Sequence, residues 1–87
     1  MNLDDIRENI NLVDDKIVAL LEERMILVSK VSEFKKSTGK ATLDEGREQT
    51  ILSRVNDGVQ NKQYAPFIVN NFIDIMKQSR DYQESLK

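Results

Sequence analysis

Residues 3–34 read LDDIRENINLVDDKIVALLEERMILVSKVSEF, and their apolar positions recur at alternating steps of three and four residues. This spacing places side chains on one stripe of an α-helix. We call that stripe the seam, and it comprises Leu3, Ile6, Ile10, Val13, Ile17, Leu20, Arg24, Leu27, Val31 and Phe34. Arg24 is the one seam residue that is not apolar. Because an unpaired buried cation is very costly, Arg24 needs a partner there, either a protein carboxylate or an anionic ligand.

The composition of the chain limits both its size class and its chemistry. Its 87 residues predict a single domain, residues 1–87. The sequence contains no Cys and no His, which excludes disulfides, the usual zinc ligand sets and nucleophilic catalysis that depends on an imidazole. Since so short a chain buries a limited core, oligomerisation is the remaining route to extra stability.

Charge and hydropathy argue against two classes of partner. The net charge is -2, whereas a nucleic-acid-binding domain carries a strongly basic surface. No apolar run approaches the roughly 20 residues that span a bilayer. The first residues, which include Asp4, Asp5 and Glu8, do not resemble a secretory signal. We therefore expect a soluble, cytoplasmic protein that binds neither nucleic acid nor membranes.

The pattern predicts an all-α chain of three helices, because no stretch sustains the apolar–polar alternation of a strand. The first helix is expected to begin near Leu3 or Asp4, with a cap at Asn2, and to end at about Lys36. Residues 37–42 then read as a stop and a loop.

Two shorter helices are expected to follow. One begins around Asp44, which resembles an N-terminal cap, and ends near Asp57–Gly58. Pro66 fits the first turn of the last helix. The core-facing stripe of that helix contains Ser79 and Gln83, whose neutral polar groups need partners inside the protein.

The first helix is too long for a compact monomer. About 33 residues span ~50 Å at ~1.5 Å each. A globule of this chain length has a radius of gyration near ~12 Å and a diameter of only ~30 Å. The seam on the excess length would be exposed to water, so we expect a second copy of the chain to cover it. The predicted assembly is an intertwined homodimer in which the long helices pack against one another.

The cations of the first helix point to a shared pocket. Arg24 and Lys35 are eleven residues apart, which places them within ~20° of one direction and ~16 Å along the axis. Arg7 lies ~25 Å from Arg24 on the same helix, but antiparallel pairing of two helices would bring it beside the other chain's Arg24. The candidate site comprises Arg7, Arg24, Lys35, Arg47, Glu48, Ser79 and Gln83. This set suits a small anionic ligand with hydroxyl or ether oxygens.

The joint spacing of these residues resembles the all-helical, AroQ-type chorismate mutases over essentially the whole chain. The residues that carry the resemblance are Leu3-Asp4-Asp5-Ile6-Arg7 with Ile10 and Asp14, Leu20-Leu21-Glu22-Glu23-Arg24, Val31 with Lys35, Leu43-Asp44-Glu45-Gly46-Arg47-Glu48, and Ser79-Arg80-Asp81-Tyr82-Gln83. Each motif alone is weak, because helical proteins are rich in Arg and Glu. Their combination in this order is fairly specific.

The resemblance implies an activity and a role for each site residue. The family converts chorismate to prephenate in the branch toward Phe and Tyr, on a three-helix chain intertwined as a dimer, without a metal or a cofactor. Arg7 of one chain and Arg24 of the other would hold the two substrate carboxylates, with Arg47 and Ser79 completing these contacts. Lys35 and Gln83 would flank the breaking ether oxygen. Glu48 would take the ring hydroxyl, with Asp44 nearby. The resemblance is also compatible with a partner enzyme of the shikimate pathway.

These residue types suit such a rearrangement, which transfers no proton and forms no enzyme adduct. Paired Arg forks can hold a flexible dianion in its compact conformer. Donors aimed at the ether oxygen stabilise the negative charge that develops there in the transition state. The amide of Gln83 donates at any pH, which predicts a nearly flat pH profile.

Several alternatives compete with this interpretation. Arg24 could pair with a carboxylate of a neighbouring helix, and Lys35 could be a solvated helix end. Arg80 and Asp81 read as surface residues. Within the same fold, isochorismate pyruvate lyase uses a similar pocket and an isomeric substrate. A non-catalytic helical module for dimerisation or docking is the alternative from another class.

Overall fold

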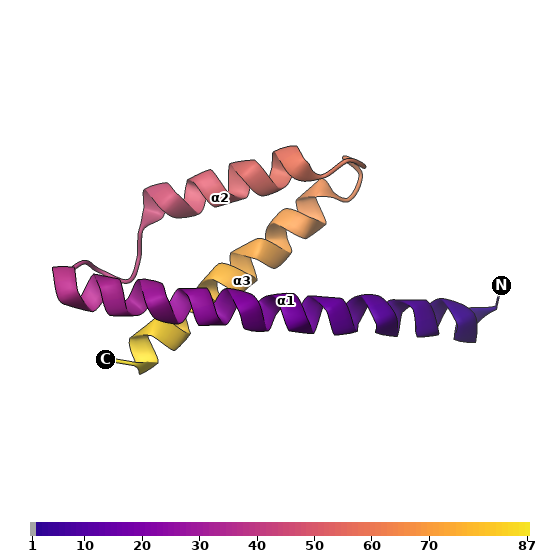
Figure 1. Ribbon diagram of the computed structural model, residues 1–87. Coiled ribbons are helices and arrows are strands. Elements are labelled where there is room, and N and C mark those ends of the chain that lie inside the picture. Colours follow the sequence, from indigo (N-terminus) through magenta and orange to yellow (C-terminus); the bar gives the residue numbers. More distant parts are fainter. Residues whose placement is uncertain (1) are drawn as a thin grey trace.

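The computed structural model describes residues 2–87, which form three α-helices. They are α1 (Leu3–Thr38), α2 (Glu45–Gly58) and α3 (Ala65–Ser85). Figure 1 shows α2 and α3 folding back as a hairpin at one end of α1, while the other end of α1 extends alone. The prediction of an all-α chain with one long N-terminal helix is confirmed for the described residues.

The ends of α1 follow the expected capping chemistry, with one correction. The Asn2 side chain accepts a hydrogen bond from the Asp5 amide at 2.9 Å, and acidic residues fill the first turn. The predicted end at Lys36 is two residues too early, because Ser37 and Thr38 remain helical. Their hydroxyls donate to carbonyl groups of the preceding turn, so these polar residues do not break the helix.

Gly39 determines where α1 stops. It adopts a φ of 70° in the left-handed region, and its N–H donates to the last carbonyls of the helix. Glycine takes this conformation without the steric penalty that a Cβ imposes. The helix therefore ends at the first residue that can adopt a left-handed conformation without steric strain.

Helix α2 begins and ends within one residue of the predicted positions, and α3 begins at Ala65, one residue before Pro66. The Asp44 side chain caps α2 by accepting from the Arg47 amide at 3.0 Å. Pro66 lies in the first turn of α3, where its missing N–H leaves no hydrogen bond unmade. No side chain caps α3 at Tyr64.

The chain has a small core and an extended shape. Helix α3 packs against both α1 and α2. Among the described residues, the buried apolar side chains are Ala65 and Met76, whereas Ser32, Thr42, Ser79 and Gln83 are buried polar residues. The radius of gyration is 15.9 Å, against ~12 Å for a compact chain of this length. Two of the four buried polar residues, Ser79 and Gln83, lie on α3, the helix that packs against both others.

The apolar residues of the seam are exposed along the whole of α1, including Leu27, Val31 and Phe34 in its C-terminal half. From Leu3 to Leu20, the seam side chains retain between 42% and 62% of their accessible surface. The chain exposes 6975 Å² in total, whereas a folded monomer of this mass is expected to expose about 5,300 Å². The prediction that the first helix is too long for a compact monomer is confirmed, because α1 extends beyond the rest of its own chain and the molecule is 54 Å long.

Candidate active site

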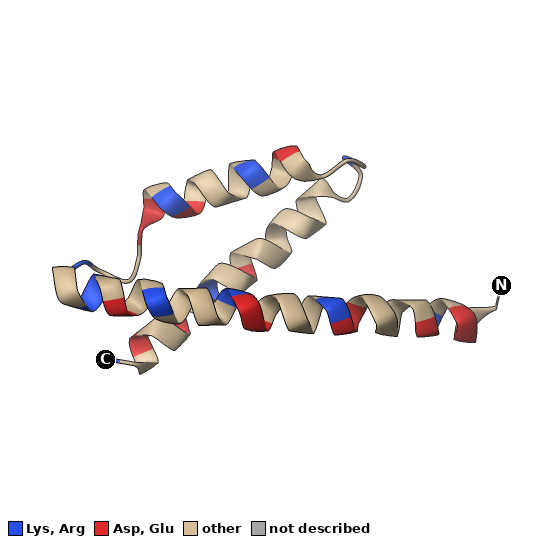
Figure 2. Ribbon diagram, in the orientation of Figure 1, with Lys and Arg blue, Asp and Glu red and all other residues tan. Residues whose placement is uncertain are grey.

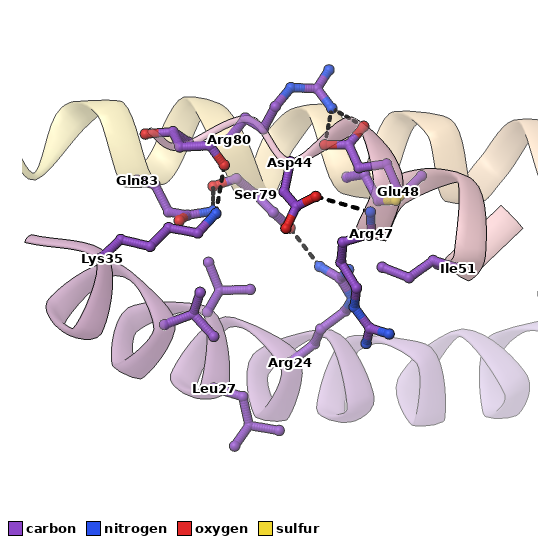
Figure 3. A pocket seen from close by; sticks show the side chains of 14 residues that line it. Arg24, Leu27, Lys35, Asp44, Arg47, Glu48, Ile51, Ser79, Arg80 and Gln83 are labelled. Atoms are coloured by element: carbon purple, nitrogen blue, oxygen red, sulfur yellow. Dashed lines mark hydrogen bonds and ion pairs between the residues drawn. The ribbon is translucent and has the colours of Figure 1, made fainter. Parts of the chain in front are cut away.

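A cleft of about 280 Å³ opens where the C-terminal half of α1 faces the start of α2 and the end of α3. Seven of the eight predicted site residues line it, namely Arg24, Lys35, Asp44, Arg47, Glu48, Ser79 and Gln83. Figure 3 shows these side chains converging from all three helices. Apolar residues that include Val31, Ile51 and Met76 complete the wall.

The Arg24 side chain extends from α1 to α3, whereas its neighbours in the seam are exposed to solvent. Its Nη1 donates to the Ser79 hydroxyl at 2.5 Å, and that hydroxyl in turn donates to the Ile75 carbonyl at 2.9 Å. In residues 2–87, no carboxylate lies within ion-pair distance of Arg24. The alternative that Arg24 pairs with a carboxylate of its own chain is therefore wrong. A neutral hydroxyl is the partner instead, and it leaves the charge of Arg24 uncompensated.

Arg24 and Arg47 bring two cations together in the cleft. Their guanidinium groups lie close to each other in Figure 3. Burial, and secondarily the positive charge of Arg47, lower the pKa of Arg24 below its usual value. This direction means that the surroundings disfavour positive charge at Arg24. An anion bound between the two side chains would relieve that cost.

Lys35 is held in the cleft by the loop between α1 and α2. Its Nζ donates to the Thr42 carbonyl at 2.6 Å. An ammonium group has three donors, so this bond leaves others free for a ligand. Thr42 was missed at the sequence level because its contribution is a backbone carbonyl, for which side-chain chemistry gives no signal.

Gln83 lies deep in the cleft with unsatisfied hydrogen-bonding capacity. The residue is buried, and its Nε2 donates to the Ser79 carbonyl across a long 3.4 Å. Its Oε1 is buried without a hydrogen-bond partner. Buried polar atoms in proteins are usually paired; Oε1 can accept a hydrogen bond from a ligand, and Nε2 keeps a second hydrogen that it can donate.

Glu48 is paired with a residue that the sequence interpretation assigned to the surface. Arg80 Nη1 donates to both Glu48 carboxylate oxygens, at 2.5 and 2.6 Å, and Arg80 lines the cleft. The surface assignment of Arg80 is therefore wrong, whereas Asp81 is exposed and pairs with Lys77. The available signal was periodicity, since Arg80 follows the core residue Met76 by four positions.

The cleft as a whole is electropositive. Its lining contains the cations Arg24, Lys35, Arg47 and Arg80 and the carboxylates of Asp44 and Glu48. The excess of cations over carboxylates matches a ligand with two negative charges. Among the described residues, no group of three His, Cys, Asp or Glu side chains is arranged to hold a metal.

Arg7 is the one predicted site residue that the chain does not bring to the cleft. It is exposed near the start of α1, 17 positions before Arg24, which corresponds to ~25 Å along the helix. This position agrees with the expectation that Arg7 cannot reach Arg24 of its own helix. Its place beside a second chain stays a prediction.

A model of one protein family, chorismate mutase type II, matches residues 6–84. The chain belongs to this family. The matched region includes all eight candidate site residues, from Arg7 to Gln83. Membership in chorismate mutase type II confirms the resemblance that the sequence motifs indicated. Neither a curated protein nor a solved structure matches the chain.

The helices of this chorismate mutase type II chain also bear on membrane association. Within residues 2–87, no helix combines the length and the apolar character that crossing a bilayer requires. Figure 2 illustrates why, since charged residues of both signs recur along the whole of α1.

Proposed function

We propose that the protein is a chorismate mutase that converts chorismate to prephenate. The observation that carries this proposal is the cleft in which Arg24, Arg47 and Lys35 converge while no carboxylate of the described chain pairs with Arg24. Such a cleft suits a small dianion, and the family match selects chorismate among dianions.

Catalysis in this proposal rests on conformational restraint. The ether C–O bond breaks while a C–C bond forms at the other end of the same molecule, so no group leaves and no proton moves. Arg24 and Arg7 of a second chain hold the two carboxylates, and Arg47 and Ser79 support them. Fixing the compact conformer brings the reacting carbons together, which lowers the entropic part of the barrier.

Electrostatic stabilisation supplies the second part. Negative charge grows on the ether oxygen as its bond to the ring breaks. Lys35 and Gln83 donate to that oxygen, and both line the cleft. Donors that are already oriented help the transition state more than the substrate, and losing one costs about 3 to 4 kcal/mol in typical cases. Glu48 accepts the hydrogen bond of the ring hydroxyl, while Asp44 serves as the cap of α2.

The proposal includes a homodimer with two shared sites. The exposed seam from Leu3 to Leu20 and the roughly 1,700 Å² by which the chain exceeds the expected surface support it. An interface of that size per chain falls in the range of obligate dimers. Antiparallel pairing of two α1 helices carries Arg7 of each chain to the other chain's cleft.

The direct test follows the loss of chorismate by absorbance and identifies the product. Prephenate supports the proposal. Unchanged chorismate contradicts it and favours a non-catalytic module, and release of salicylate and pyruvate from isochorismate indicates the lyase.

Arg24→Ala tests the central cation of the cleft. The variant is expected to lose at least ~100-fold in kcat/KM, because it removes a charge-assisted contact to a substrate carboxylate. Arg54→Ala is the matched control, since Arg54 is exposed on α2 and does not line the cleft. Equal rates for the two variants would remove Arg24 from the site.

A further inference from the structure

Arg80 and Glu48 form the one ion pair of the described residues that joins two helices. Arg80 lies on α3 and Glu48 on α2, 32 residues apart in sequence. A single nitrogen, Arg80 Nη1, reaches both carboxylate oxygens at 2.5 and 2.6 Å. Figure 3 shows the pair at the edge of the cleft, with the Glu48 carboxylate held by two interactions.

The pair differs from the other ion pairs in its burial and its place. Lys77–Asp81 and Lys87–Glu84 connect neighbouring turns of one segment, and all four side chains keep more than half of their accessible surface. Arg80 and Glu48 keep only 30% and 23%. Solvent screens such a half-buried pair less than an exposed one, so the attraction between its charges is stronger.

Glu48 creates an electrostatic difficulty for an anion-binding cleft. Asp44 is committed to the cap of α2, which leaves Glu48 as the carboxylate that faces the ligand space. A carboxylate there repels a dianionic substrate unless a cation balances it. Arg80 provides that cation, and one donor on each oxygen leaves further lone pairs to accept a hydrogen bond.

We propose that Arg80 is a positioning residue that orients Glu48 toward the ring hydroxyl of the substrate and neutralises its charge. This inference rests on the proposed function. Arg80 itself touches the carboxylate and not the reacting atoms. Its contribution is to hold one rotamer of a long side chain, which otherwise loses conformational freedom when the substrate binds.

The test compares two substrates, chorismate and an analogue that lacks the ring hydroxyl. Arg80→Gln is expected to lower kcat/KM for chorismate about 10- to 100-fold, as for other hydrogen bonds to charged groups. For the analogue the loss is expected to be clearly smaller, because Arg80 then contributes only by neutralising Glu48, which has no ring hydroxyl from which to accept a hydrogen bond. Arg54→Gln is the matched control and is expected to match the wild type on both substrates.

Two further variants separate positioning from simple support of the fold. Arg80→Lys is expected to recover most of the loss, since one nitrogen makes both contacts and an ammonium group has three donors. It also serves as the test if Arg80→Gln does not fold. In a Glu48→Gln background, Arg80→Gln is expected to change kcat/KM by no more than about twofold.

Three results would overturn the inference. They are equal losses on both substrates, an undiminished effect in the Glu48→Gln background, and wild-type kinetics for Arg80→Gln. Any of these in a chain that converts chorismate rejects the role of Arg80 alone. A wild-type chain that leaves chorismate unchanged rejects the proposed function and this inference together.

Discussion

At the scale of the residue, Arg24 differs from its neighbours in the seam because it contacts Ser79 of another helix. Leu20 and Leu27 on either side are exposed, while Arg24 is half-buried against Ser79. Burial and, secondarily, the neighbouring Arg47 make the charged form of Arg24 unfavourable, as the lowered pKa of Arg24 indicates. An anion bound beside Arg24 would relieve this cost.

Gln83→Glu tests the proposed role of Gln83 as a hydrogen-bond donor to the ether oxygen of the substrate. The amide donates at every pH, whereas a carboxyl group donates only when it is protonated. The variant is therefore expected to lose activity at neutral pH and to regain it as the pH falls, so that its optimum becomes strongly acidic. The wild type is expected to keep a nearly flat profile. The measurement is kcat/KM for chorismate from mildly acidic to mildly alkaline pH, and a variant as active as the wild type at neutral pH would contradict the role of Gln83.

At the scale of the element, the end of α1 positions the cleft. Gly39 reverses the chain so that residues 40–44 can cross to α2, and Lys35 reaches the Thr42 carbonyl of that loop. The last turn of α1 and the loop are therefore coupled by one lysine. A helix that continued past Gly39 would carry the loop away from Lys35.

Gly39→Ala is expected to destabilise the protein by about 1 kcal/mol, because an L-residue at a φ of 70° is strained. A Cβ at this position would meet no atom within 4 Å, so backbone conformation is the cause and crowding is not. Gly58→Ala is the control, since its Cβ also meets open space and its φ is not positive. Denaturant unfolding measures both variants, and equal midpoints would contradict the role of Gly39 as the cap.

At the scale of the whole molecule, the chain is extended and exposes an apolar stripe along α1. The helical hairpin packs against the C-terminal half of α1 (Figure 1), yet the apolar seam residues of both halves, from Leu3 to Phe34, stay exposed among the described residues. A second copy would satisfy two needs together, since it would cover the seam and would supply Arg7 to a cleft that otherwise lacks it.

Complementation between two inactive variants tests the shared sites. Arg7→Ala and Arg24→Ala chains are each expected to be inactive, because every site lacks one arginine. After mixing and subunit exchange, a mixed dimer has one site with both arginines and one with neither. Activity should therefore return to about one quarter of the wild-type value per chain in a random mixture, since half of the dimers are mixed. Sedimentation confirms the dimers, and mixed dimers without activity would show that Arg7 acts in its own chain or not at all.

The sequence alone determined the helices of this protein and named most residues of its candidate site. Apolar periodicity, Asn2, Asp44 and Gly39 encode local structure through contacts within a few residues, so the elements were predictable to within two residues. The candidate site residues were chosen because their spacing along the chain resembles that of a family. Only the tertiary structure decided that Arg80 forms an ion pair with Glu48. It also decided that Arg24 donates to a hydroxyl and not to a carboxylate, and that Lys35 donates to the Thr42 carbonyl. Each of these contacts depends on where other parts of the folded chain lie, and two of them join residues on different helices, which no periodicity within one helix encodes.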